Sequence, residues 1–373
     1  MASDSITTED KKRTEWKDRY RNRFFLAPMV RVGTLPMRLL CQQYGADLLW
    51  APEIVDKSIV GSERIVDDKT GVISYIKNGK DVFTTHPSEK QQVIFQLGSA
   101  EPELALAAAK TVEHDVSGFD LNCGCPKRFS IQGGMGAALM SDPDKLCSIL
   151  DVLVKNIDLP ITCKIRVFDN VEKTLELVRR IAATGISALT VHCRTKDMRP
   201  HEKAMWNRLR DIVSELPDLP IILNGDVYEY ADVQRARDET GASSVMTARG
   251  AAANPSIFRS EGMLPTMDAA QEYTKYAVRT SNNFINTKYT LLQMYPETNT
   301  QQFALLRSTR KYKDMCEAMG LAEFYESEGA ELIHSRAEPL GNNAKRQSAS
   351  AIDAAPQQAI EAAAEPSSKR VKT

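Results

Sequence analysis

The sequence predicts a (β/α)8 barrel followed by a small all-helical domain, and three observations support this prediction. Eight short apolar runs alternate with amphipathic stretches within about 240 residues, and about 250 residues is typical of such a barrel. The runs are apolar throughout, as expected for parallel strands covered on both faces. Residues 265–334 contain no strand-like run. A doubly wound sheet is the competing architecture for the first part of the chain.

The predicted elements follow one another in the order that a barrel needs. Strands are expected at 24–29, 47–51, 93–97, 118–122, 161–167, 188–192, 220–224 and 243–248. Helices are expected at 35–44, 102–114, 143–155, 171–183, 204–215 and 230–239. An irregular insert at 55–92 contains the turn Lys77-Asn78-Gly79-Lys80, which indicates a possible hairpin.

Four segments follow from this pattern. Residues 1–20 are expected to be a flexible extension, 21–262 the barrel and 263–335 the helical domain. Residues 336–373 are rich in Ala, Ser, Gln and Pro, and we expect a disordered tail there.

Composition excludes several classes of protein. The net charge of −1 argues against a globally basic nucleic-acid binder, although a locally basic face is still allowed. The odd number of cysteines, seven, favours reduced thiols. No run of about 18 apolar residues is present, so no membrane span is expected. We therefore expect a soluble, monomeric, cytoplasmic protein, with KRVK at 369–372 as a weak signal for the nucleus.

Polar or small residues follow the carboxyl ends of seven predicted strands, which is where barrels place their active sites. Residues that satisfy their own loops would explain two or three such endings, but seven facing one mouth indicate a ligand site. The endings are Ala27-Pro28-Met29-Val30, Gln96-Leu97-Gly98, Asn122-Cys123-Gly124-Cys125-Pro126, Lys164 with Arg166, His192-Cys193-Arg194, Asn224-Gly225-Asp226 and Ala248-Arg249-Gly250.

The last two of these loops predict a phosphate-bearing cofactor. Barrels commonly bind phosphate with the loops after strands seven and eight. Here those loops supply small residues and the cation of Arg249. Lys164 and His192 could then reach a flavin ring at the barrel mouth. Taken alone, each is more often structural: a lysine here as an ion-pair partner, and a histidine as a satisfied strand-end residue.

The pair Cys123 and Cys125 allows two interpretations. A C-x-C pair could bind a metal, but a structural zinc site needs four ligands and no second close pair of Cys or His is present. No metal is therefore expected. Cys125, before Pro126 on a loop, would be protonated near neutral pH and could act as a general acid. Cys123 is expected to be a packing residue.

Several long motifs resemble the tRNA-dihydrouridine synthases, and they cover about residues 22–333. They include LNCGCPK at 121–127, GGMGAALMSDPDK at 133–145, CKIR at 163–166, HCR at 192–194, NGD at 224–226 and SSVMTARGAAANPSIF at 243–258. The segments at 27–40, 286–294 and 318–326 look like the eukaryotic branch that acts on position 20 of tRNA. The family more often has a non-cysteine where this chain has Cys123.

The resemblance implies a barrel that binds FMN and a helical domain that binds tRNA, with NADPH as the reductant. Cys125 matches the catalytic cysteine, and Asn122 and Arg166 would lie near the uracil or flavin. Animal members carry a double-stranded-RNA-binding domain for which residues 336–373 are too few, so tRNA affinity would come from the other two domains. The positions that match FMN-binding residues are Pro28, Met29, Val30, Gln96, Lys164, His192, Asn224, Gly225, Asp226, Ala248 and Arg249.

The implied reaction saturates a uracil ring in tRNA. Hydride would pass from reduced FMN to uracil C6, while Cys125 protonates C5 and Lys164 and His192 stabilise the reduced flavin. Two alternatives stay open. A small-molecule flavin reductase, such as a dihydroorotate or dihydropyrimidine dehydrogenase, would not need a basic helical domain, and a catalytically idle tRNA-binding protein would not need Cys125.

Cations in the helical domain indicate a tRNA-binding face. Arg307, Arg310, Lys311 and Lys313 crowd into what we expect to be one helical stretch, where spacings of three and four place Arg307, Arg310 and Lys311 on one face. A solvated helix face is the alternative interpretation. Phosphate contacts from these side chains would give affinity without base specificity.

Overall fold

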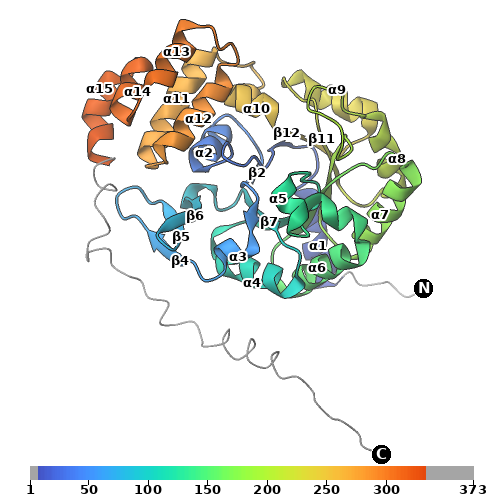
Figure 1. The fold of residues 1–373 in the computed structure, drawn as a ribbon. Coiled ribbons are helices and arrows are strands. Elements are labelled where there is room, and N and C mark those ends of the chain that lie inside the picture. Colours follow the sequence, from blue (N-terminus) through green and yellow to red (C-terminus); the bar gives the residue numbers. More distant parts are fainter. Residues whose placement is uncertain (1–6, 333–373) are drawn as a thin grey trace, which may run out of the picture. The chain divides into compact units, whose positions relative to one another are not determined.

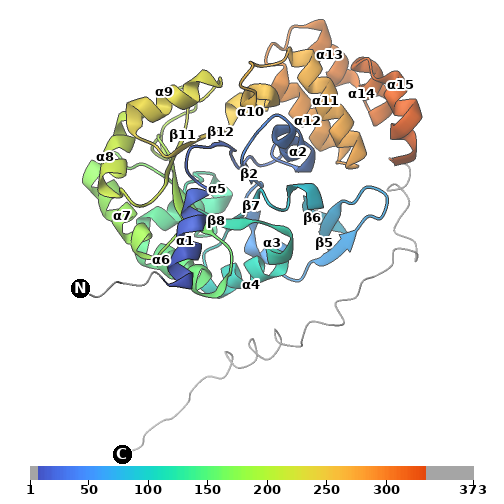
Figure 2. The same ribbon diagram turned by 180° about the vertical axis from the view of Figure 1, so that it is seen from behind.

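Eight parallel strands form a closed barrel in the computed structural model, which describes residues 7–332 (Figures 1 and 2). The strands pair in the order β2-β1-β12-β11-β10-β9-β8-β7, and pairing of β2 with β7 closes the circle. The predicted barrel is confirmed, and the doubly wound alternative is excluded. The strands are β1 Phe24–Leu26, β2 Leu49–Trp50, β7 Val93–Gly98, β8 Gly118–Asn122, β9 Ile161–Arg166, β10 Ala188–His192, β11 Ile221–Asn224 and β12 Ser244–Thr247.

Amphipathic helices cover the outside of the barrel. In α7, Thr174, Leu177, Val178 and Ile181 are buried at spacings of three and one, as expected for a helix with one apolar face. Asn170 caps this helix by accepting a hydrogen bond from the backbone N–H of Lys173. The helices of the barrel are α2 Leu35–Gln43, α3 Asp56–Ile59, α4 Pro102–Val112, α5 Arg128–Gln132, α6 Pro143–Asn156, α7 Val171–Ala183, α8 Asn207–Glu215, α9 Ala231–Thr240 and α10 Arg249–Ala253.

The insert after β2 forms a small sheet of its own. Strand β3 (Ile54–Val55) pairs with β7, and then β4 (Glu63–Val66), β5 (Ile73–Lys77) and β6 (Lys80–Thr85) make an antiparallel sheet. Asn78 and Gly79 both have positive φ, 51° and 70°, as a two-residue hairpin turn requires. The predicted hairpin is therefore confirmed.

The amino-terminal segment differs from the expectation of a flexible extension over residues 1–20. Residues Thr8–Asp18 form helix α1, and Tyr20 is completely buried. Arg19 donates hydrogen bonds to the carbonyl oxygens of Ser117 (3.1 Å) and Gln91 (2.9 Å). This contact was not predicted because both carbonyls lie more than 70 residues away in the sequence.

The helical domain follows the barrel and contacts its first loop. Asn286 donates a hydrogen bond to the carbonyl of Arg31 (2.6 Å), and the Arg31 guanidinium lies 3.8 Å from the centre of the Tyr289 ring. The predicted tail at 336–373, including KRVK, lies outside the described residues. The helices are α11 Thr266–Arg279, α12 Phe284–Met294, α13 Gln301–Ser308, α14 Tyr312–Ala318 and α15 Ala322–Phe324, with a π-helical turn at Tyr325–Gly329.

Within residues 7–332, no helix is both long enough and apolar enough to cross a membrane.

Candidate active site

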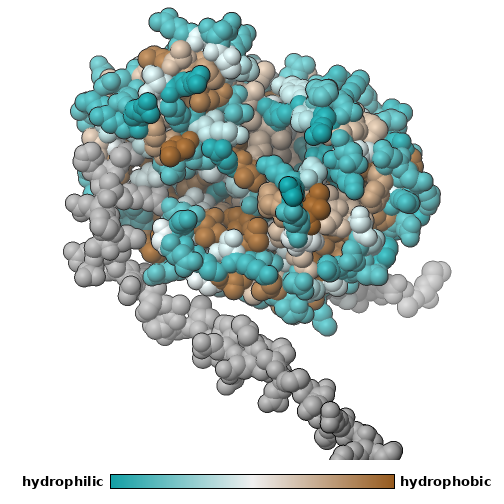
Figure 3. Space-filling view, in the orientation of Figure 1, coloured by the Kyte–Doolittle hydropathy of each residue, from teal (hydrophilic) through white to brown (hydrophobic). Residues whose placement is uncertain are grey.

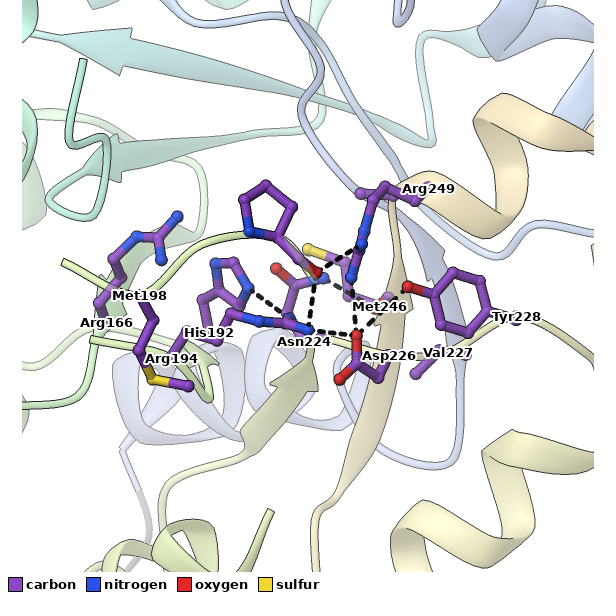
Figure 4. Close-up of a pocket in the computed structure, with 13 residues that line it drawn as sticks. Arg166, His192, Arg194, Met198, Asn224, Asp226, Val227, Tyr228, Met246 and Arg249 are labelled. Atoms are coloured by element: carbon purple, nitrogen blue, oxygen red, sulfur yellow. Dashed lines mark hydrogen bonds and ion pairs between the residues drawn. The ribbon is translucent and has the colours of Figure 1, made fainter. Parts of the chain in front are cut away.

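A pocket of about 200 Å³ opens at the carboxyl ends of β10, β11 and β12 (Figure 4). It brings together seven residues that the sequence predicted to bind cofactor or substrate: Arg166, His192, Asn224, Gly225, Asp226, Ala248 and Arg249. The other residues that line it are Arg194, Met198, Pro200, Val227, Tyr228 and Met246.

Asp226 organises one wall of this pocket. Its Oδ1 accepts hydrogen bonds from Arg194 (2.5 Å) and Arg249 (2.7 Å), and its Oδ2 accepts from the backbone N–H of Ala204 (2.6 Å). Together these contacts hold the pKa of the Asp226 carboxyl below its usual value, against the raising effect of burial. The backbone of Asp226 lies in the left-handed region, at φ 56°.

Gly225, directly before Asp226, must be small. Its φ is 121°, and a Cβ there would lie 3.1 Å from Ala204 Cβ and 3.2 Å from His192 Cδ2. Trp206 donates from its indole N–H to the Gly225 carbonyl (2.8 Å). The Asn-Gly-Asp turn is therefore fixed from both sides, with its backbone at the surface of the pocket.

Arg249, the cation that we expected to face a phosphate, is only half-buried. Its side chain is 46% exposed and is shared between Asp226 and the carbonyl oxygen of Pro200 (2.8 Å). The guanidinium also lies 5.3 Å from the centre of the Tyr228 ring. Figure 4 shows Arg194 and Arg249 meeting on the same carboxylate. Part of the charge of Arg249 is thus already neutralised within the protein.

His192 is a neutral imidazole in this environment. Burial, followed by the charges of Lys164 and Arg166, lowers the pKa of His192 far below its ordinary value. Arg194 Nη1 lies 3.3 Å from His192 Nε2, and arginine can only donate. Nε2 therefore accepts, and Nδ1 carries the proton.

Lys164 lies on β9 close to buried polar side chains of the barrel interior. Burial, followed by the charge of Arg166, lowers the pKa of Lys164 to about 8, although Asp120 counteracts part of this effect. Asp120 accepts hydrogen bonds from Gln96 (2.7 Å) and Thr162 (2.7 Å). The amide N–H of Gln96, a predicted cofactor contact, is therefore engaged by the barrel interior.

The loop that carries Cys125 is shaped by Asn122 and Arg166. Asn122 Oδ1 accepts from the backbone N–H groups of Gly124 (3.0 Å) and Cys125 (3.1 Å). Arg166 donates to the carbonyl of Gly124 (2.7 Å). Both predicted substrate contacts thus bind the cysteine loop itself. Cys125 is half-buried, and burial raises the pKa of its thiol, so the thiol is protonated at neutral pH.

Cys123 lies in the interior, as predicted. It is fully buried, and its Sγ is 3.6 Å from Sγ of Cys163 on the neighbouring strand. Among residues 7–332, no group of three His, Cys, Asp or Glu side chains could hold a metal ion.

The remaining predicted cofactor contacts lie on neighbouring strand ends but do not line the pocket. Pro28, Met29 and Val30 form the loop after β1, and Val30 is 43% exposed. The backbone N–H of Gly33 donates to the carbonyl of Met29 (2.8 Å), which closes this loop.

The predicted basic stretch is not one helix, so the prediction from helical spacing was wrong. Helix α13 ends at Ser308 and α14 begins at Tyr312, so Arg310 and Lys311 lie in the turn between them. Asp314 accepts hydrogen bonds from both of their backbone N–H groups, at 2.9 and 3.2 Å. The turn nevertheless leaves the side chains of Arg307, Arg310 and Lys311 exposed.

Lys288, on α12, lies against this turn, a contact that the sequence reasoning did not predict. Its ammonium group donates to the carbonyls of Arg307 (2.6 Å) and Thr309 (2.8 Å). Burial, together with the charges of Arg310 and Arg307, lowers the pKa of Lys288. We call Lys288, Arg307, Arg310 and Lys311 the basic turn. Lys313 points its charge elsewhere, in an ion pair with Glu326 at 3.0 Å.

Two further residues of the barrel mouth were not predicted to contact cofactor or substrate. Arg194 is almost completely buried and contacts both His192 and Asp226; its position in the strand-end motif HCR could have revealed it. Tyr228 follows the predicted Asn-Gly-Asp turn and donates to Asp226 at 3.3 Å. Nothing in the sequence indicated that Met198 and Pro200, from a long loop, would complete the pocket.

A closed parallel barrel with a cationic pocket at its strand ends and a half-buried cysteine beside it defines an enzyme-like site. Comparison with known proteins identifies the family. The model of the dihydrouridine synthase (Dus) family matches residues 25–353, so the chain belongs to that family.

Curated relatives agree with this assignment. The chain is 47% identical over 311 residues to the tRNA-dihydrouridine(20) synthase [NAD(P)+] of Schizosaccharomyces pombe, covering 80% of this chain and 65% of that protein. It is 39% identical over 313 residues to the Saccharomyces cerevisiae protein of the same name, covering 78% and 82%. A tRNA-dihydrouridine(20a/20b) synthase of S. cerevisiae is 32% identical over 237 residues, covering 62% of this chain and 60% of that protein. The chain thus spans slightly less than two thirds of the length of the S. pombe relative.

Proposed function

We propose that this chain is an FMN-dependent tRNA-dihydrouridine synthase that reduces the C5=C6 bond of a uridine, at position 20, with NADPH as the electron source. The observation that carries the proposal is the half-buried thiol of Cys125, whose pKa is raised by burial, at the strand ends of a barrel that belongs to the dihydrouridine synthase family. A thiol in this state is suited to protonating carbon, because it holds its proton until a base develops beside it.

The pocket fits the phosphate of a flavin mononucleotide. Three arginines line it, Arg166, Arg194 and Arg249, against the single carboxylate of Asp226. Because His192 is neutral, two positive charges are left for a dianionic group. Because Gly225 has no side chain and Ala248 only a methyl group, a phosphate could approach the backbone at these positions. When bound and reduced, FMN would supply the hydride that Cys125 cannot.

The chain's own residues would then position the uracil and supply one proton. Cys125 would donate from Sγ to C5, while Asn122 and Arg166 hold its loop in place through Gly124. Lys164, with a pKa of about 8, is charged in most molecules at neutral pH and would stabilise negative charge at the barrel mouth. The target uracil must unstack and flip out of the tRNA to reach the barrel mouth, which costs about a few kcal/mol.

The exposed basic turn favours tRNA over a free pyrimidine as the substrate. A small-molecule reductase has no use for a cationic surface outside its pocket, whereas a tRNA backbone would contact one. On the face drawn in Figure 3, hydrophobic residues lie among hydrophilic ones in the central region, where Figure 1 places α5. Phe129 and Ile131 of α5 are 49% and 41% exposed, next to Lys127 and Arg128. Exposed aromatic and basic groups together suit an unstacked nucleotide.

The proposal is tested with purified full-length chain, NADPH and tRNA isolated from cells that lack this gene. We expect a yellow protein, oxidation of NADPH that depends on tRNA, and one new dihydrouridine mapped to position 20. Reduction of free uridine or orotate at a comparable rate would identify a small-molecule reductase. A colourless protein that binds tRNA but does not oxidise NADPH would identify the idle binding protein.

A further inference from the structure

A carboxyl group lies beside Cys125 that neither the sequence analysis nor the proposed mechanism uses. Glu53 sits between β2 and β3, at the same end of the barrel as the cysteine loop. Its carboxyl rests against Gly98 at the end of β7, where a Cβ would lie only 2.8 Å from Glu53 Oε1. The side chains of Cys125, Asn122 and Ser130 lie near enough to this carboxyl to favour its charged form.

Two atoms of this niche are buried without a hydrogen-bond partner. Glu53 Oε1 and Ser130 Oγ are both sealed from solvent, and no group among the described residues completes a hydrogen bond to either. Buried polar atoms in this state cost free energy and are rare in native proteins. Their position near Cys125 indicates a role in the proton transfer proposed for its thiol.

The backbone around Cys125 leaves little freedom for this arrangement. Gly136, at φ 57°, has no room for a side chain, because a Cβ would collide with Ser130 Oγ and lie 2.7 Å from the Cys125 carbonyl oxygen. The N–H of Ala137 donates to the same carbonyl (2.9 Å). The Cys125 loop and the Ser130 hydroxyl are therefore held close together.

Charged groups face the thiol from each neighbouring element. Glu53 comes from the segment after β2, Lys127 from the start of α5, and Lys164 and Arg166 from β9. The three cations favour the thiolate, whereas burial and the charge of Glu53 raise the pKa of Cys125. Burial likewise raises the pKa of Glu53. Two half-buried acids close to each other resist carrying two negative charges at once.

We propose that Glu53 is a positioning residue for Cys125, and that the carboxyl and the thiol hold at most one negative charge between them. The proposal rests on the proposed function of Cys125 as the proton donor. When the S–H bond breaks and the C5–H bond forms, the electron pair stays on sulfur as a thiolate. As this happens, the carboxylate of Glu53 takes up a proton from water at the barrel mouth. It then passes this proton to sulfur, so that the S–H bond re-forms and Glu53 is a carboxylate again.

The test measures the thiol itself, without tRNA or turnover. The rate at which iodoacetamide alkylates Cys125, followed on its own peptide by mass spectrometry, reports the thiolate fraction at each pH. In the wild-type protein we expect the midpoint above the ordinary thiol value of about 8.5. Glu53→Gln keeps the shape and removes the charge, so the midpoint should fall by about one pH unit and the rate at neutral pH should rise about tenfold.

Two matched variants separate charge from structure. Glu53→Asp retains the charge and should keep the midpoint raised. Gly98→Ala keeps Glu53 unchanged, but the added Cβ would displace its carboxyl. The midpoint should therefore fall, by less than in Glu53→Gln. Flavin content and thermal unfolding of each variant show whether the barrel is intact.

A wild-type midpoint at or below about 8.5, or coincident profiles for wild-type and Glu53→Gln protein, would overturn the proposal. If Glu53→Gln does not fold, the wild-type midpoint and the Gly98→Ala profile decide. Failure of the proposed function would show up separately, as absence of uridine reduction by wild-type protein whatever its alkylation profile.

Discussion

The barrel mouth and the basic turn both gather positive charge, but they hold it in different ways. At the mouth, Arg194 is 3% exposed and shares Asp226 with Arg249, and burial shifts the pKa values of Lys164 and His192. In the basic turn, Arg307, Arg310 and Lys311 are exposed. Desolvated charges interact strongly and specifically, whereas solvated charges act over a longer range and are screened by salt. The two regions should therefore respond to substitution on different scales and in different assays.

The largest effect is expected at the thiol of the mouth. Cys125→Ala should lower the rate of uridine reduction by about 10² to 10⁴, the usual contribution of a general acid. Flavin content and tRNA affinity should be unchanged, because Cys125 does not line the cationic pocket. Single-turnover reduction of tRNA by pre-reduced enzyme measures the step. Reduction at the wild-type rate would remove Cys125 from the role of proton donor.

Cys123→Ala is the matched control, two residues away on the same loop. Its side chain is fully buried against Cys163, so some stability should be lost while the rate of uridine reduction stays near wild type. A large rate loss here would mean that the whole loop, rather than the Cys125 thiol, is being tested.

The second effect in size concerns Lys164 and has a defined pH window. Its pKa is lowered from 10.5 to about 8, so between these values the unfolded chain binds more protons than the folded one. The free energy of unfolding contributed by Lys164 therefore rises with pH across that window. The full change is at most about 3 kcal/mol, and less to the extent that water reaches the ammonium group.

Lys164→Met should remove this dependence. In flavin-free protein, the variant's stability advantage over wild type should be greatest at pH 7 and shrink by pH 10, as followed by urea unfolding. Lys155→Met, on an exposed site of α6, should leave the pH dependence unchanged. Parallel stability curves for wild type and Lys164→Met would show that Lys164 is not desolvated in the folded state.

The residues of the barrel mouth could be predicted from the sequence because parallel strands in a barrel place their carboxyl ends together. Once eight alternating strands were assigned, Asn122, Lys164, His192 and Asn224 had to converge at one rim, and strand register confirms this by pairing Asn122 with Lys164 and His192 with Asn224. The same reasoning does not describe how side chains pair across the rim. The bonds of Asp226 to Arg194 and Arg249 join residues 32 and 23 positions apart, a spacing set by the fold alone.

Local sequence pattern predicted secondary structure less well in segments whose conformation depends on tertiary contacts. The basic turn looked like a continuous helix, but Thr309 and the capping role of Asp314 interrupt it. Helix α1 was taken as a flexible extension because its sequence is strongly polar, yet Arg19 and Tyr20 anchor it to the barrel. Glu53 was overlooked because its partner Cys125 is distant in sequence.

The third effect is expected at Arg249 and should be modest. Its side chain is half-exposed and already shared with Asp226 and Pro200, so Arg249→Ala should weaken FMN binding by about tenfold, the low end for a charged hydrogen bond. Flavin retained after gel filtration at several dilutions measures this. The control Arg235→Ala removes an exposed arginine paired with Asp232 outside the pocket. Equal retention by both variants would argue against phosphate at this site.

The smallest effect per residue is expected in the basic turn, where it should depend on salt. Reversing two exposed charges, Arg310→Glu with Lys311→Glu, should raise the KM for tRNA several-fold and reduce the salt slope of binding by about one for each phosphate that is no longer neutralised. The cap at Asp314 uses backbone N–H groups, so the turn itself should survive. Flavin content and the pH profile of the thiol should be unchanged, because the turn lies outside the barrel.

The matched control reverses Lys155 and Lys173, exposed on the outer helices α6 and α7. If the two double variants bind tRNA equally weakly at low and at high salt, the weakening reflects net charge rather than direct phosphate binding, and the tRNA-binding surface lies elsewhere on the molecule.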